Sequence, residues 1–259
     1  MKIIVNNFLI LVLSIFFTSQ VLFAENEQKP KVRKNFYKEK IAALRVVAKF
    51  SEKEGNEEKI KANYEMLAKT CEDAINDPNI SERFKTKAKK YLAEAKFKLG
   101  YKDEALQDCE DIAYSKNQSD RSALNLKATF YKKMGDDLVK EKNYEEGISK
   151  YKDAIDLDIS SQKKAFFKGV IATTYLQMND YDKVIEWDQK ILDEHPDEIN
   201  SCACALIIMA TAYECKNDID KAKETYLRVI EEYSSSSWVD CAKENLKLLQ
   251  DVAGEKNVE

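Results

Sequence analysis

The segment 135–158, GDDLVKEKNYEEGISKYKDAIDLD, carries two glycines twelve residues apart in an otherwise charged, helix-favouring run. A glycine inside a helix costs roughly 1 kcal/mol relative to alanine, so two of them need a reason. Apolar residues recur at three- and four-residue steps on either side of Lys142-Asn143, which predicts two amphipathic helices joined by a polar turn. Gly135 and Gly147 therefore fall one on each helix of a hairpin, where a missing side chain lets two backbones approach closely.

The same pairing of small residues recurs along the chain. The second residue of each pair is Ala105, Gly147, Val184 or Ala222, and the first, twelve residues earlier, is Ala93, Gly135, Ala172 or Ala210. The spacings of 42, 37 and 38 residues give one helical hairpin per period, which is the signature of a stacked α-solenoid. We therefore predict an all-α fold in which these eight residues pack at the contacts between helices.

The paired positions are expected to accept small side chains and to reject large ones. Since Ala105 and Ala222 stand where Gly147 does, Gly147→Ala should be neutral or slightly stabilising. Gly147→Leu should overpack the contact and cost about 1–3 kcal/mol.

At these residues the chain resembles the tetratricopeptide repeat (TPR) family. The matching features are the two small residues, a tyrosine three residues after the first, and an aromatic residue four after the second. They are seen at Tyr175, Tyr213, Tyr151 and Tyr226, with Pro196 closing one repeat. The resemblance covers four repeats in 82–235 and implies a right-handed α-solenoid.

The regions on either side of the four repeats are also predicted to be helical. Residues 36–81 form an irregular N-terminal repeat, in which counting from Gly55 makes Ile60 the second paired position and counting back from Pro78 makes it Leu67. Residues 236–252 have apolar residues at helical spacing and are predicted to be a capping helix, because the ends of a solenoid need a polar outer face. Residues 253–259 are expected to be a disordered tail.

Within the resemblance, the first helices of the repeats line a concave groove that holds a protein or peptide partner. The residues three before and one after the first small position would face this groove. They are Lys90, Glu94, Lys132, Asp136, Gly169, Thr173, Ile207 and Thr211. The family's clamp for C-terminal carboxylates has Asn one residue after the small position, and this chain has none there. Reversing Lys90 and Lys132 to Glu is expected to weaken partner binding with little change in stability.

Composition and motifs disfavour nucleic-acid binding and catalysis. The net charge is −4 and the chain has only five arginines, so an arginine-rich face for phosphates is absent. His195 is the single histidine, and the sequence contains no glycine-rich phosphate loop, HExxH or GxSxG motif. We predict no catalytic residues, no cofactor and no metal site.

The six cysteines divide into two groups. Cys71 and Cys109 fall on predicted buried faces and are expected to be core residues. Cys202 or Cys204 lies 39 or 37 residues before Cys241, close to one repeat period, so either could form a disulfide with Cys241. For Cys202, Cys204 and Cys241 the sequence thus allows either free thiols in the core or this disulfide.

The N-terminus predicts export. Residues 1–24 have Lys2, an apolar run from Phe8 to Phe17 and a small residue, Ala24, which together are typical of a signal peptide cleaved after Ala24. Residues 25–35 would then be a flexible linker. The alternative is an uncleaved segment that anchors the protein in the inner membrane. No cysteine follows the apolar run at a lipidation position, so a lipoprotein is not expected.

An exported array with this period is similar to bacterial envelope TPR proteins. Two examples are the repeat lipoprotein of the outer-membrane β-barrel assembly machine and the periplasmic partner of the Tol-Pal system. The resemblance implies a non-catalytic scaffold in the periplasm that binds a protein or peptide. A eukaryotic lumenal protein or an exported enzyme is the alternative from another class.

Overall fold

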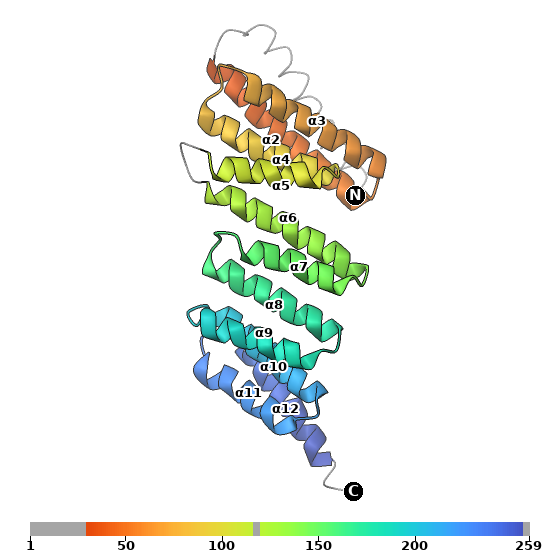
Figure 1. Ribbon diagram of the computed structural model, residues 1–259, viewed down its shortest axis with the longest axis vertical. Helices are drawn as coiled ribbons and strands as arrows, with labels where there is room; N and C mark the ends of the chain where they lie inside the picture. Colours follow the sequence, from red (N-terminus) through yellow and green to blue (C-terminus); the bar gives the residue numbers. More distant parts are fainter. Residues whose placement is uncertain (1–29, 116–119, 256–259) are drawn as a thin grey trace, which may run out of the picture. The chain divides into compact units, whose positions relative to one another are not determined.

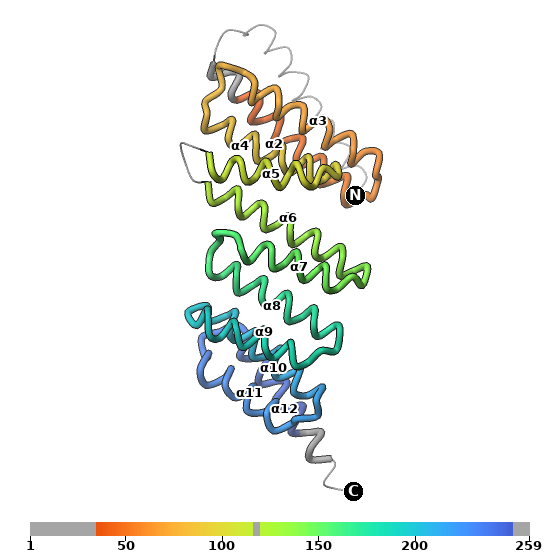
Figure 2. Tube along the Cα trace, viewed as in Figure 1, coloured from red at the N-terminus to blue at the C-terminus, as the bar shows by residue number. Residues whose placement is uncertain are grey.

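The computed structural model describes residues 30–115 and 120–255, which form eleven helices and no strand. The helices are α2 (Pro30–Glu54), α3 (Glu57–Asn76), α4 (Glu82–Lys98), α5 (Lys102–Ala113), α6 (Arg121–Lys140), α7 (Tyr144–Ile155), α8 (Ser161–Gln177), α9 (Tyr181–Glu194), α10 (Ile199–Cys215), α11 (Ile219–Glu232) and α12 (Val239–Glu255) (Figure 1). Successive helices pair into antiparallel hairpins, as the trace in Figure 2 shows. The prediction of an all-α fold built from helical hairpins is confirmed.

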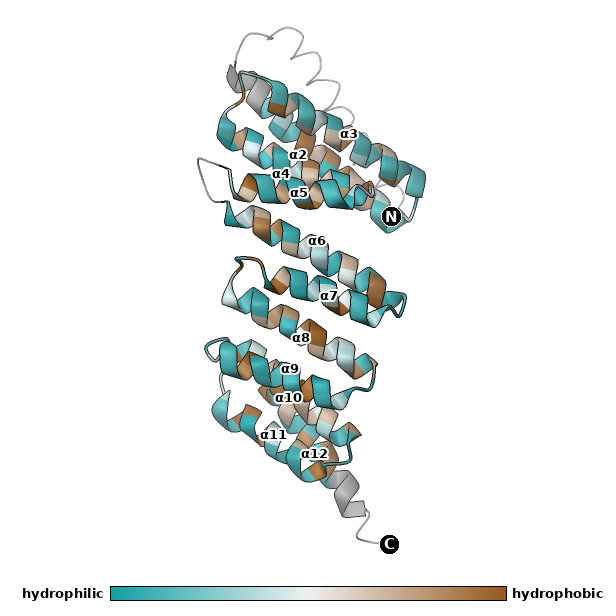
Figure 3. Ribbon diagram, in the orientation of Figure 1, coloured by the Kyte–Doolittle hydropathy of each residue, from teal (hydrophilic) through white to brown (hydrophobic). Residues whose placement is uncertain are grey.

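Two compact units, 1–127 and 128–259, divide the chain within α6. In the first unit, a core of Ile41, Leu44 and Leu67 with their neighbours joins α2, α3 and α4. In the second, Leu206 on α10 packs with Val229 on α11 and with residues of α12. Helix α10 is rich in apolar residues, which suits a helix against which α8, α9 and α11 all pack; the part of it visible in Figure 3 is coloured mainly as apolar.

Three segments that the sequence predicts lie near the ends of the chain: the signal peptide, the linker and the capping helix. The expected signal peptide, 1–24, lies outside the described residues. Helix α2 begins at Pro30, so half of the expected linker 25–35 is helical. Helix α12 runs to Glu255, beyond the expected end of the capping helix at 252, and shortens the expected tail to 256–259, which lies outside the described residues.

Every hairpin turns at a residue with left-handed backbone. These residues are Gly55 (φ 68°), Gly100 (φ 95°), Lys142 (φ 66°), Asn179 (φ 58°) and Asn217 (φ 61°). In four of the turns the next N–H donates to a carbonyl five residues back, for example Asn143 N to Leu138 O at 2.8 Å and Asp180 N to Tyr175 O at 3.0 Å. This is the Schellman ending of a helix, which glycine and asparagine favour because they enter the left-handed region at little cost.

The two glycines of the α6–α7 hairpin lie at a very close helix contact. A Cβ on Gly147 would lie 2.7 Å from Cγ2 of Val139 and 3.1 Å from the carbonyl oxygen of Gly135. A Cβ on Gly135 would lie 2.8 Å from Cδ1 of Tyr151, inside the ring's van der Waals surface. Since Val139 is branched at Cβ and cannot swing aside, the expectation that alanine is tolerated at 147 is wrong.

The structure also decides the register of α3. The second paired residue is the fourth residue of α5, α7, α9 and α11, and the fourth residue of α3 is Ile60. Four residues later, buried Tyr64 donates its hydroxyl to Glu52 at 2.9 Å, just as Tyr226 donates to Glu214 at 2.5 Å. Ile60, and not Leu67, is therefore the equivalent position.

The eight paired residues are all buried. They are Ala93, Ala105, Gly135, Gly147, Ala172, Val184, Ala210 and Ala222. Small side chains at these places let the two helices of each hairpin pack closely, which fixes the first helices where they can line a surface.

Candidate functional site

A groove in the first unit is a large cavity with a strongly charged lining. It has a volume of about 890 Å³ and is lined by α2, by α4 and by the first turns of α6. Its charged lining consists of the cations Lys38, Arg45, Arg83, Lys87 and Lys90 and the acids Glu94 and Asp120. Five cations against two carboxylates leave three positive charges in a chain whose net charge is −4.

Helical spacing places these side chains along the groove. Arg83, Lys87, Lys90 and Glu94 follow one another at steps of four, three and four residues, so they share one face of α4. Lys38 and Arg45 are seven residues apart, two turns along α2. The two helices thus present cations from opposite walls.

Part of this charge is tied up inside the groove. Arg45 Nη2 donates to Glu94 Oε2 at 3.0 Å, and the Arg45 guanidinium stacks 4.1 Å from the centre of the Tyr91 ring. Lys90 Nζ lies 2.8 Å from Asp120 Oδ2 and donates to Ser122 Oγ at 2.6 Å. Burial raises the pKa of Asp120, but the hydrogen bonds from Lys90 and Ser122 outweigh it and hold that pKa below its usual value. These contacts order the floor of the groove.

The remaining cations are available to a ligand. Lys38, Arg83 and Lys87 are exposed, and no described carboxylate lies within ion-pair distance of any of them. Lys87 Nζ lies 5.7 Å from the centre of the Tyr91 ring. A positive cavity with unpaired cations at its rim attracts negatively charged groups.

The sequence-predicted groove residues are divided by the structure. Lys90 and Glu94 line the first-unit groove. In the second unit, Lys132 pairs with Asp136 at 2.8 Å, and Asp136 also accepts the Tyr151 hydroxyl at 3.0 Å. These two residues are therefore engaged within their own hairpin.

The other four predicted groove residues add little polar surface. Gly169, Thr173 and Thr211 are half-buried, and the two threonines donate to the carbonyls of Val170 and Ile207 in their own helices, at 2.9 and 3.0 Å. Ile207 is only 8% exposed and belongs to the core around α10. The expectation that Ile207 lines a groove is wrong, because Ile207 is buried where α8, α9 and α11 pack against α10.

Sequence reasoning missed Lys38, Arg45, Arg83, Lys87 and Asp120. The spacing of Arg83, Lys87 and Lys90 on one face of α4 was a usable signal. The contribution of α2 could not be placed, because the register of the first repeat was open between Ile60 and Leu67.

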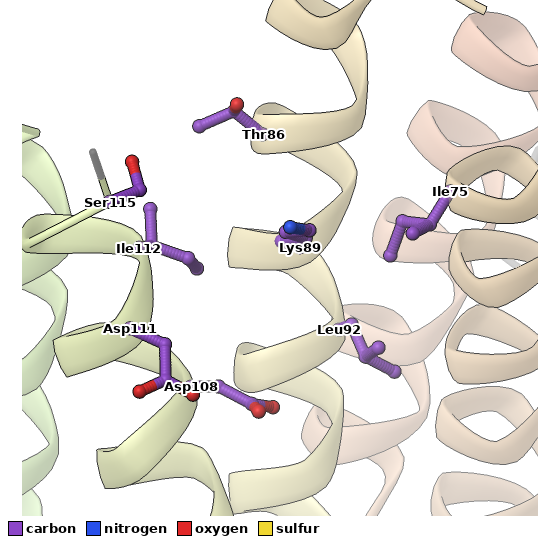
Figure 4. A pocket seen from close by; sticks show the side chains of 8 residues that line it. All are labelled: Ile75, Thr86, Lys89, Leu92, Asp108, Asp111, Ile112 and Ser115. Carbon is purple, nitrogen blue, oxygen red and sulfur yellow. The ribbon is translucent and has the colours of Figure 1, made fainter. Parts of the chain in front are cut away.

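A smaller cavity of about 260 Å³ lies among α3, α4 and α5 (Figure 4). Its wall is apolar at Ile75, Leu92 and Ile112. Of its two acids, Asp108 pairs with Lys96 at 2.8 Å and Asp111 accepts from Gln107 at 2.9 Å. Paired acids around so small a space do not form a second candidate site.

His195 has an unusual setting but no catalytic geometry. Its Nδ1 lies 2.8 Å from Ser161 Oγ, while its buried Nε2 has no partner. Burial, followed by the charge of Lys168, lowers the pKa of His195. No carboxylate hydrogen-bonds the ring in the described part of the chain, so nothing orients it as a base for Ser161.

The cysteines are all free thiols, so the bridge expected from Cys202 or Cys204 to Cys241 is not formed. Cys202 donates to the carbonyl of His195 at 3.2 Å, which turns its sulfur to the start of its own helix. Cys204 is near Asp188 and Cys241, and burial raises its pKa to about 11. Cys71 and Cys109 are fully buried, as core residues should be.

No three His, Cys, Asp or Glu side chains in the described part of the chain are grouped so that they could hold a metal ion. Among the helices of residues 30–115 and 120–255, none combines the length and the apolar character needed to cross a bilayer.

The fold and groove define a helical-hairpin repeat protein. No protein-family model matches the chain, and no curated protein matches its sequence. The solved apo form of RapI is 13% identical with a TM-score of 0.54, over 98% of this chain and 73% of RapI. Since the identity is so low, this likeness shows a shared fold and nothing more.

Two other solved structures are similar over most of the chain. BtubC from P. vanneervenii is 16% identical with a TM-score of 0.49, over 92% of this chain and 87% of BtubC. The TPR domain of P58(IPK) is 15% identical with a TM-score of 0.37, over 93% of this chain and 66% of that domain. These scores are too low to argue from.

Proposed function

We propose that the protein is a non-catalytic scaffold whose first-unit groove binds an acidic, extended segment of a protein or peptide partner. The observation that carries this proposal is the set of three exposed cations, Lys38, Arg83 and Lys87, with no carboxylate partner in the groove. The TPR resemblance supports the location, because α2, α4 and α6 are first helices and the family binds partners on that surface.

Electrostatics explains why the occupant should be acidic. Lys38 on one wall and Arg83 and Lys87 on the other have no carboxylate partner, so their like charges repel one another across the groove. A carboxylate between the walls replaces this repulsion with attraction. Arg83 presents a planar guanidinium that can hold a carboxylate through two parallel hydrogen bonds.

The proposed location is the periplasm, with cleavage after Ala24. Support comes from the apolar run and small residue of the N-terminus. The chain purified from its native cell should then begin at Glu25, as measured by intact mass. A retained N-terminus would favour the membrane-anchored version of the same scaffold.

The binding test uses a short fluorescein-labelled poly-glutamate peptide and fluorescence anisotropy. The triple variant Lys38→Glu, Arg83→Glu, Lys87→Glu should bind at least about tenfold more weakly than wild type, and wild-type binding should weaken as salt is raised. The matched control reverses three exposed lysines outside the groove, Lys61, Lys89 and Lys102. Equal binding by wild type and the groove variant would exclude this groove as the acidic site.

Lys90 is a poor choice for this test. Lys90→Glu places a carboxylate beside Asp120, and Lys132→Glu places one beside Asp136. Because each lysine neutralises an acid, we now expect the Lys90 and Lys132 reversals to lower stability as well as binding.

A further inference from the structure

The outer face of the first hairpin exposes a cluster of apolar side chains. On α2, Val46 is 51% exposed and Phe50 is 40% exposed. On α3, Met66 is 49% exposed and Ala62 is also exposed. We call Val46, Phe50, Ala62 and Met66 the outer patch.

The antiparallel pairing makes this patch continuous. The turn lies at Gly55-Asn56, so Phe50 and Ala62 are at the same height on the two helices, and Val46 and Met66 are one turn further on. At about 100° per residue, Val46 lies on the opposite side of α2 from Leu44, which is in the core. Arg45 contacts Glu94 of α4, and Asn63 of α3 contacts Ser51 of α2. The patch therefore borders the α2–α3 seam on the side away from α4.

On the α10–α11 hairpin, the side that faces the preceding helices is covered. In the second unit, α10 packs on both helices of the α8–α9 hairpin and contributes Cys202 and Ala205 to a shared cluster. The outer patch is thus a face of the kind that receives another pair of helices, left without one in the described residues. An apolar patch on a helical face, rimmed by charges, is typical of an interaction surface.

The charges of the two helices point to the occupant. Over residues 35–54, α2 has five basic and three acidic residues, a net +2, while α3 has three basic and five acidic residues, a net −2. A second hairpin of the same sequence, turned by a two-fold rotation, would place the basic helix of each copy on the acidic helix of the other. A two-fold interface is self-complementary in this way.

We propose that the outer patch is a self-association surface at which two copies of this chain form a symmetric dimer, with α2 of each copy against α3 of the other. The apolar residues form its centre. Exposed Lys49 and Lys53 on α2, together with exposed Glu58 and Glu65 on α3, form its rim.

The first experiment is sedimentation equilibrium of the purified chain. Wild type should be a dimer at about 100 μM. The double variant Val46→Glu, Met66→Glu should have a dimer dissociation constant at least roughly tenfold higher. Both replaced residues are exposed, so melting temperatures should change little. The matched control, Leu227→Glu with Leu248→Glu, changes exposed apolar residues of α11 and α12 and should leave the dimer intact. A monomeric wild type would overturn the proposal, including the case in which residues 1–29 cover the patch.

The second experiment tests the pairing of α2 with α3. One variant reverses Lys49 and Lys53 to Glu, and the other reverses Glu58 and Glu65 to Lys. Each alone brings like charges together and should dimerise more weakly than wild type. Mixed together, the two variants should form a heterodimer, because the acidic α2 of one meets the basic α3 of the other. Failure to associate on mixing would overturn this arrangement. Variants that had merely lost their fold would not form a heterodimer, so a positive result cannot come from unfolding.

Discussion

The α6–α7 and α8–α9 hairpins solve the same packing problem with different residues. In α6–α7, the missing side chain of Gly135 leaves room for the Tyr151 ring, and the Tyr151 hydroxyl donates to Asp136 at 3.0 Å. At the three matching positions, α8–α9 has Ala172, Val184 and Asp188. The comparison shows that the small residues and the tyrosine depend on each other. Protein interiors are closely packed, so a larger residue at a paired position leaves no room for a tyrosine ring beside it.

Asp188 is the exceptional residue of this comparison. Its side chain is fully buried and neither carboxylate oxygen has a hydrogen-bond partner. Burial raises its pKa well above the usual value, so the group favours its neutral form. Tyr64, Tyr151 and Tyr226 occupy the matching position in other hairpins and each has a carboxylate acceptor. The α8–α9 hairpin therefore contains a polar group that the repeat pattern does not satisfy.

Removing the ring from α6–α7 should have the largest effect. Tyr151→Ala should reduce the free energy of unfolding by about 3–5 kcal/mol, since it leaves a cavity beside Gly135. Urea unfolding measures this. Tyr114→Ala, at an exposed tyrosine, should change stability by less than about 0.5 kcal/mol. Similar losses at the two tyrosines would contradict the packing role of Tyr151.

The glycine contact gives the next prediction. Gly147→Ala should cost about 1–3 kcal/mol, because its Cβ meets Val139. In a Val139→Ala background the same change should cost much less, and a double-mutant cycle of unfolding free energies measures this coupling. Additive costs would show that Val139 is not the obstacle.

The buried acid predicts a pH dependence. The folded chain keeps a proton on Asp188 that the unfolded chain releases above the ordinary pKa of 3.8. Its contribution to stability is therefore complete below that pH and declines, by up to about 1.4 kcal/mol per pH unit, until the raised folded-state pKa is passed. Asp188→Asn should remove this decline. The free energy of unfolding of the variant, minus that of wild type, should therefore increase from pH 4 towards neutrality. Parallel stability curves for the two proteins would refute the assignment.

The turns give the smallest expected effect. Lys142 has a left-handed backbone in the α6–α7 turn, where α8–α9 has Asn179. Lys142→Gly should stabilise the protein by about 1 kcal/mol, whereas Asn179→Gly should change it by only a few tenths. Thermal unfolding compares the two. A destabilised Lys142→Gly would mean that the lysine side chain makes a contact worth more than the backbone strain.

Much of the fold could be predicted because its signals are local. Apolar spacing marked the helices, and the paired small residues marked the contacts within hairpins. Those patterns could not show that Ile207 is covered, since this depends on several helices meeting around α10. The burial of Asp188 could not be predicted either, because an aspartate in a charged helix normally lies on the surface.

The candidate site was harder to predict. Lys90 and Glu94 were found from repeat positions, but their partners lie far along the chain, Asp120 for Lys90 and Arg45 for Glu94. The predicted disulfide depended on spacing alone, and spacing does not fix the direction of a thiol such as that of Cys202.

The recurring left-handed turns also bear on how the chain folds. Each hairpin has its own stop signal, such as Asn217, followed by its own start signal, such as Asp218, which accepts from Lys221 N at 3.3 Å. Helix pairs joined by such short turns make mostly contacts of low sequence separation, and chains of low contact order fold rapidly. Within each unit, folding can begin at any hairpin and spread to its neighbours. A polypeptide emerging from the ribosome could thus complete one hairpin before the next is synthesised.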